Sequence, residues 1–493
     1  MKGIIGVVVV VAGLFGASPG LAEPLPTAAP EARGFDSGRL AEVLPQIDAS
    51  GLPIHSLLLM RGGEVILDAY FHPYDGKTPH DLASVTKSVM TSLTAIAAEE
   101  GELDLDAPLL SFFPDRAIAN RDARKERITV RHLTQMTSGL ACIGLPEEVT
   151  LDQMEASPDF VQFALDLPMA AEPGTTFSYC SPGMHLLSAI LTQATGRTAF
   201  DYGKEKLFAP LGISEVIWDA DPQGITRGWG DLHLLPHDMA RLGILWLHGA
   251  AWEGRQIIPA DWFKAATTQA ITSDRYEDYG YGFWIGPKNE PVPYFMASGR
   301  GGQRILVAPV LDLIVVSTGG GFDLGDVIDP VIETLADPEK GLPPNPDGEA
   351  RLAAALGAIA AVPGPQPVPP LPAMAAEISG RTYRLPPNFG GLVSVRLDFP
   401  GGAEATLTLA DAQGAPAHPV GLDGVYRFSP GESGMPIGVT GKWADKSTFV
   451  LDYNTIGNIR AFTITARYAG DTLEMTIVSR DEGFTLTLEG QAE

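Results

Sequence analysis

The most specific chemical signal in the sequence is a serine followed three residues later by a lysine, Ser84-Val85-Thr86-Lys87. Residues i and i+3 share one face of a helix, so we expect Lys87 beside Ser84 in a first helical turn, where the helix dipole favours negative charge. A serine hydroxyl becomes a good nucleophile when a base removes its proton, and a lysine is that base only if it is held neutral. The pair indicates nucleophilic catalysis, and the alternative is a helix-capping serine with a surface lysine.

A second candidate is Tyr179, which follows a Pro-Gly turn at residues 173–174 and precedes an expected helix from Met184 to Ala194. A phenol placed over Ser84 and Lys87 can relay protons as base and acid, with its pKa lowered by the nearby ammonium. The alternative is a core tyrosine whose hydroxyl is satisfied by the backbone.

The third candidate is the glycine-rich run at residues 297–303 (ASGRGGQ), immediately before an expected strand. Glycine there allows a substrate to lie against the backbone, with an amide directed at a forming oxyanion. Taken alone, such a cluster also fits a turn or a bulge.

The elements around these candidates indicate a mixed fold. Apolar residues at helical spacing predict a helix from Ser84 to Glu100, and two apolar runs around residues 61–64 predict a hairpin. Two more strands are expected at residues 305–307 and 313–316. Strands near both ends with helices between them favour an α/β layer architecture whose sheet is largely antiparallel.

The composition changes after residue 362. Residues 363–373 are rich in proline, which lacks a backbone donor and fixes φ, so this stretch is expected to be an extended linker. Beyond it, apolar residues recur with a period of two, which predicts an all-β barrel or sandwich at residues 374–493. A separate unit that carries the three candidate segments is then expected at residues 23–362. The runs of the C-terminal module fit internal packing better than a partner-docking surface, although docking remains an alternative.

Together, Ser84-x-x-Lys87, Tyr179 and the run at 297–303 resemble the serine β-lactamase and penicillin-binding protein superfamily, specifically its class C-like serine hydrolases. The resemblance covers roughly residues 35–340 and includes the phrases at residues 128–140, 234–240 and 279–284. It implies an antiparallel sheet flanked by helices with a helical subdomain. It also implies Ser84 as nucleophile, Lys87 as base or proton relay, and Tyr179 as partner base and acid.

The resemblance further implies backbone oxyanion donors at Ser84 and Arg300, and substrate contacts from Ser181, Ser298 and Gly299. The family commonly has Tyr-x-Asn where this chain has Tyr179-Cys180-Ser181, and β-lactamases have Lys-Thr-Gly where it has Ala297-Ser298-Gly299. The absent lysine normally holds the β-lactam carboxylate, although Arg300 or Arg304 could replace it in part.

These departures favour cleavage of a carboxylic ester or amide that needs no anionic group. A β-lactamase or D,D-peptidase proper, and a non-catalytic protein that only binds such ligands, remain as alternatives.

Composition excludes several other classes of function. The chain has 493 residues, of which 45% are hydrophobic, so it is not a disordered protein. It carries 34 Lys and Arg against 60 Asp and Glu, a net charge of −26, which disfavours nucleic acid as a partner. Histidines and cysteines show no metal-ligand spacing, so no metal or organic cofactor is expected, and His132, His233 and His237 are interpreted as structural.

The N-terminal 22 residues have the pattern of a signal peptide: Lys2, an apolar run from Ile4 to Phe15, and small residues ending at Ala22. The apolar run is shorter than a bilayer span requires, so no membrane span is expected after its removal. A periplasmic or secreted protein is therefore predicted. In that oxidising space Cys142 and Cys180 could form a disulfide that clamps the loop after Leu140 to the strand carrying Tyr179, and two buried thiols are the open alternative.

Overall fold

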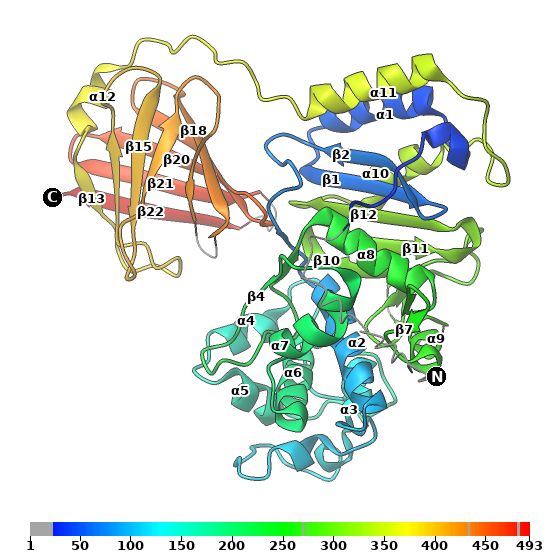
Figure 1. Ribbon diagram of the computed structural model, residues 1–493. Coiled ribbons are helices and arrows are strands. Elements are labelled where there is room, and N and C mark those ends of the chain that lie inside the picture. The colour runs from blue at the N-terminus through cyan, green and yellow to red at the C-terminus, as the bar shows by residue number, and fades with distance from the viewer. Residues whose placement is uncertain (1–22, 269–270, 274, 432–433, 481–483) are drawn as a thin grey trace, which may run out of the picture.

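The computed structural model describes residues 23–268, 271–273, 275–431, 434–480 and 484–493. These residues form two bodies joined by an extended segment (Figure 1). Helix α11 (Pro346–Ile359) lies before that segment and helix α12 (Ala373–Ile378) follows it. The predicted signal peptide at residues 1–22 lies outside the described residues. Within the described ranges, no helix is both long enough and apolar enough to cross a bilayer.

An antiparallel sheet lies at the centre of the first body. In the described part of the chain it has seven strands, in the order β2 (Glu64–Tyr70), β1 (Ile54–Arg61), β12 (Leu313–Gly319), β11 (Gln303–Ala308), β10 (Phe295–Gly299), β9 (Trp284–Ile285) and β8 (Asp278–Tyr279). The predicted hairpin is β1 and β2, and the two later predicted strands lie within β11 and β12. Leu58 of β1 pairs with Val316 of β12, so segments from the beginning and the end of the chain that forms this body lie side by side in the sheet.

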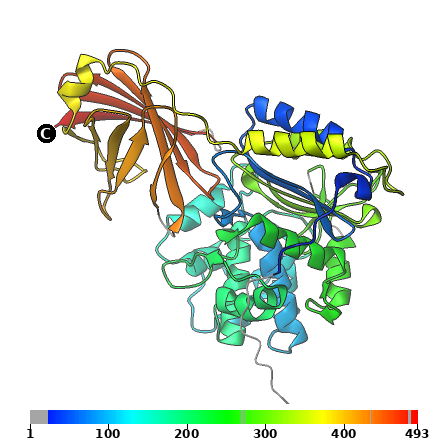
Figure 2. The same ribbon diagram turned by 45° about the horizontal axis from the view of Figure 1, so that its top comes forward.

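Both faces of the sheet are covered by helices. Leu57 and Leu59 of β1 pack in one core with residues of α1 (Ser37–Ala49) and α11, whereas Leu58 and Met60 pack in the other core, against α2 (Val85–Glu99). Successive side chains of a strand point to opposite faces, so a strand buried on both faces reads as an unbroken apolar run. Figure 2 shows α1 and α11 lying side by side over the first face.

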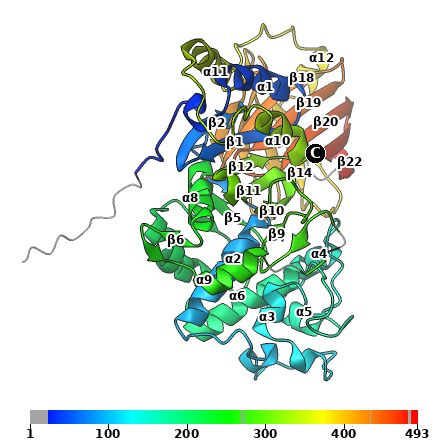
Figure 3. The ribbon, with the colours of Figure 1, turned by 90° about the vertical axis from the view of Figure 1, so that its right-hand side faces the viewer.

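Helix α2 links the sheet to a helical subdomain on the second face (Figure 3). All its residues from Val85 to Ala97 are buried, as expected for a helix surrounded by other elements. The other helices of the first body are α3 (Val130–Thr134), α4 (Val149–Glu155), α5 (Phe160–Asp166), α6 (Ser181–Thr195), α7 (Ala199–Gly203), α8 (Pro236–Leu247), α9 (Ala260–Thr268) and α10 (Leu324–Ile332). Its remaining short strands are β3 (His80–Asp81), β4 (Ile217–Trp218), β5 (Leu232–Leu234), β6 (Ala251–Trp252) and β7 (Arg255–Gln256).

The second body is a β-barrel, which decides between the two predicted all-β forms. Its strands are β13 (Thr382–Arg384), β14 (Ser394–Asp398), β15 (Glu404–Ala410), β16 (Ala417–Gly421), β17 (Arg427–Pro430), β18 (Pro436–Trp443), β19 (Thr448–Thr455), β20 (Ala461–Ala469), β21 (Thr472–Ser479) and β22 (Thr485–Ala492). Among the described residues, nine strands close the barrel where Gly421 of β16 pairs with Thr440 of β18, and β17 lies outside this ring on β18. Alternate residues such as Leu451, Ile464 and Met475 fill the interior.

Candidate active site

Ser84 and Lys87 are in direct contact at the start of α2. The Lys87 ammonium donates hydrogen bonds to Ser84 Oγ (2.7 Å) and to the Trp229 carbonyl oxygen (2.9 Å). Ser84 occupies the N-cap position, but its side chain does not cap the helix. Lys87 is only 1% exposed. The alternative of a capping serine with a surface lysine is therefore wrong.

The environment of Lys87 favours its neutral form. Burial lowers the pKa of Lys87 from 10.5 to about 8, and the positive charge of Arg300 acts in the same direction. The negative charges of Glu148 and Asp231 raise the pKa of Lys87 and partly oppose this effect. An amine with a pKa near neutrality can take a proton from an adjacent hydroxyl.

Tyr179 lies over the same lysine. It belongs to the irregular segment before α6, not to a strand as predicted. Lys87 Nζ lies 4.8 Å from the centre of the Tyr179 ring, which also stacks on Trp284 with a centroid separation of 5.9 Å. The aromatic contact fixes the plane of the phenol, and the start of α6 fixes its backbone.

The expected direction of the Tyr179 pKa is wrong. Burial, together with the negative charge of Glu148, raises the pKa of Tyr179 well above its ordinary value, while hydrogen bonding to Ser84 acts weakly in the opposite direction. The phenol therefore stays protonated at neutral pH. It is suited to donate a proton or hydrogen bond, whereas Lys87 is suited to accept one.

The backbone at the nucleophile is strained and tightly packed. Ala83, directly before Ser84, has φ of 46°, in the left-handed region, which costs about 1–3 kcal/mol for a residue other than glycine. The Asp81 carboxylate supports this turn by accepting a hydrogen bond from the Ala83 amide (2.8 Å). A Cβ at Gly299 would lie 2.4 Å from the Leu82 carbonyl oxygen and 3.0 Å from the Ser84 amide nitrogen. Only glycine allows β10 to approach the nucleophile this closely.

The glycine-rich run is therefore part of the sheet. Residues 297–299 lie in β10, Arg300 begins the short helical turn η6 (Arg300–Gly302), and the run ends at Gln303, where the expected strand, β11, begins. This geometry places the start of η6 directly after the glycine that touches the Ser84 amide. Ala297 is fully buried in the core, and Ser298 on the next position is half-buried.

Arg304, one of the two residues expected to replace the absent lysine in part, is bound by backbone carbonyl groups. Its guanidinium is buried, and Nη1 donates to the carbonyl oxygens of Gly299 and of Gln303, the latter at 2.8 Å. Its hydrogen bonds therefore hold the β10–β11 connection together.

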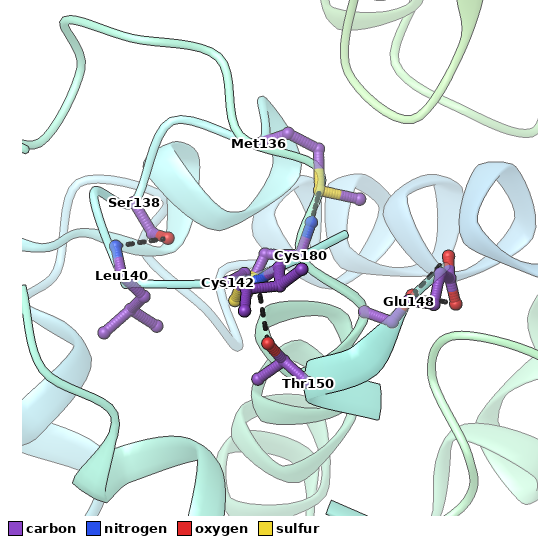
Figure 4. The surroundings of a disulfide bond; sticks show 9 residues. Met136, Ser138, Leu140, Cys142, Glu148, Thr150 and Cys180 are labelled. Carbon is purple, nitrogen blue, oxygen red and sulfur yellow. Dashed lines mark hydrogen bonds between the residues drawn. A yellow bond between two sulfur atoms is a disulfide. The ribbon is translucent and has the colours of Figure 1, made fainter. Parts of the chain in front are cut away.

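A disulfide joins the loop after α3 to the segment that carries Tyr179. Cys142 and Cys180 are bonded, with 5.4 Å between their Cα atoms (Figure 4). The loop ends at Glu148, whose two carboxylate oxygens each accept from the Ser181 hydroxyl at 3.2 Å. Ser181, predicted as a substrate contact, is thus engaged by a carboxylate beside the tyrosine.

The barrel also reaches this region, which the sequence did not predict. Residues 456–460, between β19 and β20, contact the first body: the Gly457 carbonyl accepts from the Asp81 amide at 2.7 Å. Ile459 is buried, and a Cβ at Gly301 would lie 2.7 Å from its Cγ2 atom. This loop therefore supports both η6 and the strand that leads to Ser84.

Other functional neighbours that the sequence analysis missed are the Trp229 carbonyl, Asp231 and Glu148. None of them belongs to a motif, and a backbone acceptor leaves no trace in residue types. The three histidines have local partners: His132 takes part in a capping box with Thr129, His233 lies 3.2 Å from the Asp231 carbonyl oxygen, and His237 lies 2.9 Å from the Asp68 carboxylate.

Solved structures share the fold. A putative 6-aminohexanoate-dimer hydrolase from Bacillus anthracis matches with a TM-score of 0.52 and 18% identity, covering 69% of this chain and 88% of that one. The octameric penicillin-binding protein homologue from Pyrococcus abyssi matches with a TM-score of 0.50 and 18% identity, covering 92% of this chain and 100% of that one. The second match extends over both bodies.

Sequence comparison gives the family. The 6-aminohexanoate-dimer hydrolase of Paenarthrobacter ureafaciens is 24% identical over 330 residues, which are 60% of this chain and 82% of that protein. Esterase EstB of Burkholderia gladioli is 25% identical over 191 residues, 36% of this chain and 48% of the esterase. The monacolin J acid methylbutanoyltransferase of Aspergillus terreus is 30% identical over 163 residues, and this match spans 30% of the chain and only 39% of that relative. The family model described as Beta-lactamase matches residues 40–319, and the chain belongs to this family.

Proposed function

We propose that the protein is a serine hydrolase that cleaves a carboxylic ester or amide through an acyl-enzyme on Ser84. The observation that carries this proposal is the contact between Ser84 Oγ and the buried Lys87 amine at 2.7 Å. The relatives of this chain include proteins named as a 6-aminohexanoate-dimer hydrolase, an esterase and a methylbutanoyltransferase, which is consistent with acyl transfer as the shared chemistry.

In the proposed first step, neutral Lys87 takes the hydroxyl proton of Ser84 as Oγ attacks the substrate carbonyl carbon. The backbone amides of Ser84 and Arg300 stabilise the oxyanion. Tyr179, protonated because of its raised pKa, gives a proton to the departing alcohol or amine and regains it from Lys87. The products of this step are the free leaving group and the acyl ester of Ser84.

In the second step, water attacks the acyl ester while a proton passes back through the same two side chains. The carboxylic acid leaves, and Ser84 regains its hydroxyl proton. The Trp229 carbonyl holds Lys87 in place throughout, because its hydrogen bond at 2.9 Å does not depend on the serine.

The buried Ala297 and the backbone-bound Arg304 favour a substrate without a required carboxylate. Penicillin turnover is therefore disfavoured relative to simple esters and amides. We propose that the protein is located in the periplasm or the extracellular space, because the first 22 residues have a signal-peptide pattern and a disulfide lies beside the site.

The test is the Ser84→Ala variant assayed with p-nitrophenyl butanoate. We expect hydrolysis to be lost while the circular dichroism spectrum and melting temperature stay unchanged. Mass spectrometry of acid-quenched wild type should find the butanoyl adduct on the peptide that contains Ser84. Retained activity in the variant, or an adduct on another residue, would refute the assignment.

A further inference from the structure

The Glu148 side chain has no role in the mechanism above. Glu148 ends the loop that begins at Cys142, and its charge acts on both Lys87 and Tyr179. Two contacts hold this loop against the catalytic segment: the Cys142–Cys180 disulfide, and the packing of Gly144, where a Cβ would lie 2.1 Å from the Tyr179 carbonyl oxygen. Within the loop, the Glu148 amide donates a hydrogen bond to the Gly144 carbonyl oxygen (2.8 Å). Glu148 is thus fixed beside the reacting groups.

The backbone gives no reason for a glutamate at this position. Glu148 has φ of 48° and ψ of 35°, a left-handed conformation that glycine or asparagine adopts at lower cost. It precedes α4 but its side chain makes no capping hydrogen bond. The side chain is directed instead to Ser181, at the first turn of α6. The carboxylate itself therefore accounts for the residue better than the local fold does.

The carboxylate has capacity for a further donor. A carboxylate offers about four acceptor positions, and the Ser181 hydroxyl is the side-chain donor that contacts it among the described residues. Within the same described ranges, no lysine, arginine or histidine forms an ion pair with Glu148, whereas nearby Asp231 is already paired with Arg227 at 2.9 Å. Glu148 is half-buried, so an incoming group can reach it and water screens it only in part.

We propose that Glu148 binds a positively charged amino group of the substrate, so that the enzyme prefers esters or amides that carry a primary ammonium group near the scissile bond. This proposal rests on the proposed hydrolase function. The ammonium donates to the carboxylate that Ser181 orients, while the scissile carbonyl lies at Ser84. A charge-assisted hydrogen bond of this kind is worth about a tenfold to hundredfold preference over an uncharged group of the same shape.

The experiment compares substrates in which an ammonium group replaces a methyl group. For the acyl side, the pair is the p-nitrophenyl esters of 3-aminopropanoic acid and of butanoic acid. For the leaving-group side, the pair is 3-aminopropyl butanoate and butyl butanoate, and their hydrolysis is measured by the release of acid. The value of kcat/KM is measured for each substrate at a neutral pH that keeps the amines protonated. For each enzyme, kcat/KM of the cationic substrate is then divided by kcat/KM of the neutral one.

We expect wild type to prefer the cationic member of at least one pair by about tenfold or more. Glu148→Gln keeps the shape and the contact with Ser181 but removes the charge, so its ratio should fall close to one. The matched control is Glu147→Gln, at the adjacent exposed glutamate, whose ratio should equal that of wild type. Because each ratio compares two substrates on one enzyme, a change in the basicity of Lys87 cancels.

No preference in wild type, a preference that survives Glu148→Gln, or an equal loss in Glu147→Gln would overturn the proposal. Failure of the proposed function gives a different result, because wild type would then hydrolyse neither member of either pair. In that case saturation-transfer NMR measures the binding of the same four compounds to the intact protein. The ratio of cationic to neutral binding is then compared between wild type and Glu148→Gln.

Discussion

Hydrolysis should slow about tenfold for each pH unit below about pH 8, because the reaction requires the neutral form of Lys87. Burial lowers the pKa of Lys87 from 10.5 to about 8, which corresponds to about 3 kcal/mol in favour of the neutral amine. The neutral fraction is then about one half at pH 8, about a tenth at pH 7 and about a hundredth at pH 6. Activity is thus present above the folded-state pKa and is lost as the pH falls through it.

The assay is kcat/KM for p-nitrophenyl butanoate measured from about pH 6 to about pH 9.5 at constant ionic strength, with circular dichroism at each pH to confirm folding. The charges that face Lys87 are Glu148 and Asp231, which raise its pKa, and Arg300, which lowers it. Glu148→Gln should therefore move the midpoint to lower pH, and Arg300→Gln should move it to higher pH. A flat profile, or a midpoint near pH 6 that neither variant moves, would refute Lys87 as the titrating base.

Two further predictions concern the supports of the site. Gly299→Val should lower kcat/KM by at least about a hundredfold, because a Cβ 2.4 Å from a backbone carbonyl forces β10 away from the nucleophile. The control is Gly357→Ala, on an open helix surface, which should leave kcat/KM unchanged. Ile459→Ala should lower both the free energy of unfolding, by about 2–4 kcal/mol, and kcat/KM, because its side chain packs on Gly301. The exposed Val310→Ala is the matched control, and wild-type kcat/KM in Ile459→Ala would show that the barrel loop does not position the site.

Local patterns determined much of the fold from the sequence. The hairpin of β1 and β2, the helix after Ser84 and the period of two in the C-terminal module were all readable, because each reflects the geometry of a few consecutive residues. Whether the C-terminal strands form a barrel or a sandwich was not readable. That choice depends on the pairing of Gly421 with Thr440, a contact between strands that are not consecutive in the chain.

For the site, the sequence by itself determined the contact between Ser84 and Lys87, because three residues along a helix fix their relative position. Tertiary structure decided the rest. The burial that lowers the pKa of Lys87 and raises that of Tyr179 comes from packing between α2, α6 and the sheet. The same holds for the contacts of Glu148 with Ser181 and of Ile459 with Gly301, since spacing along the chain carries no information about such long-range contacts.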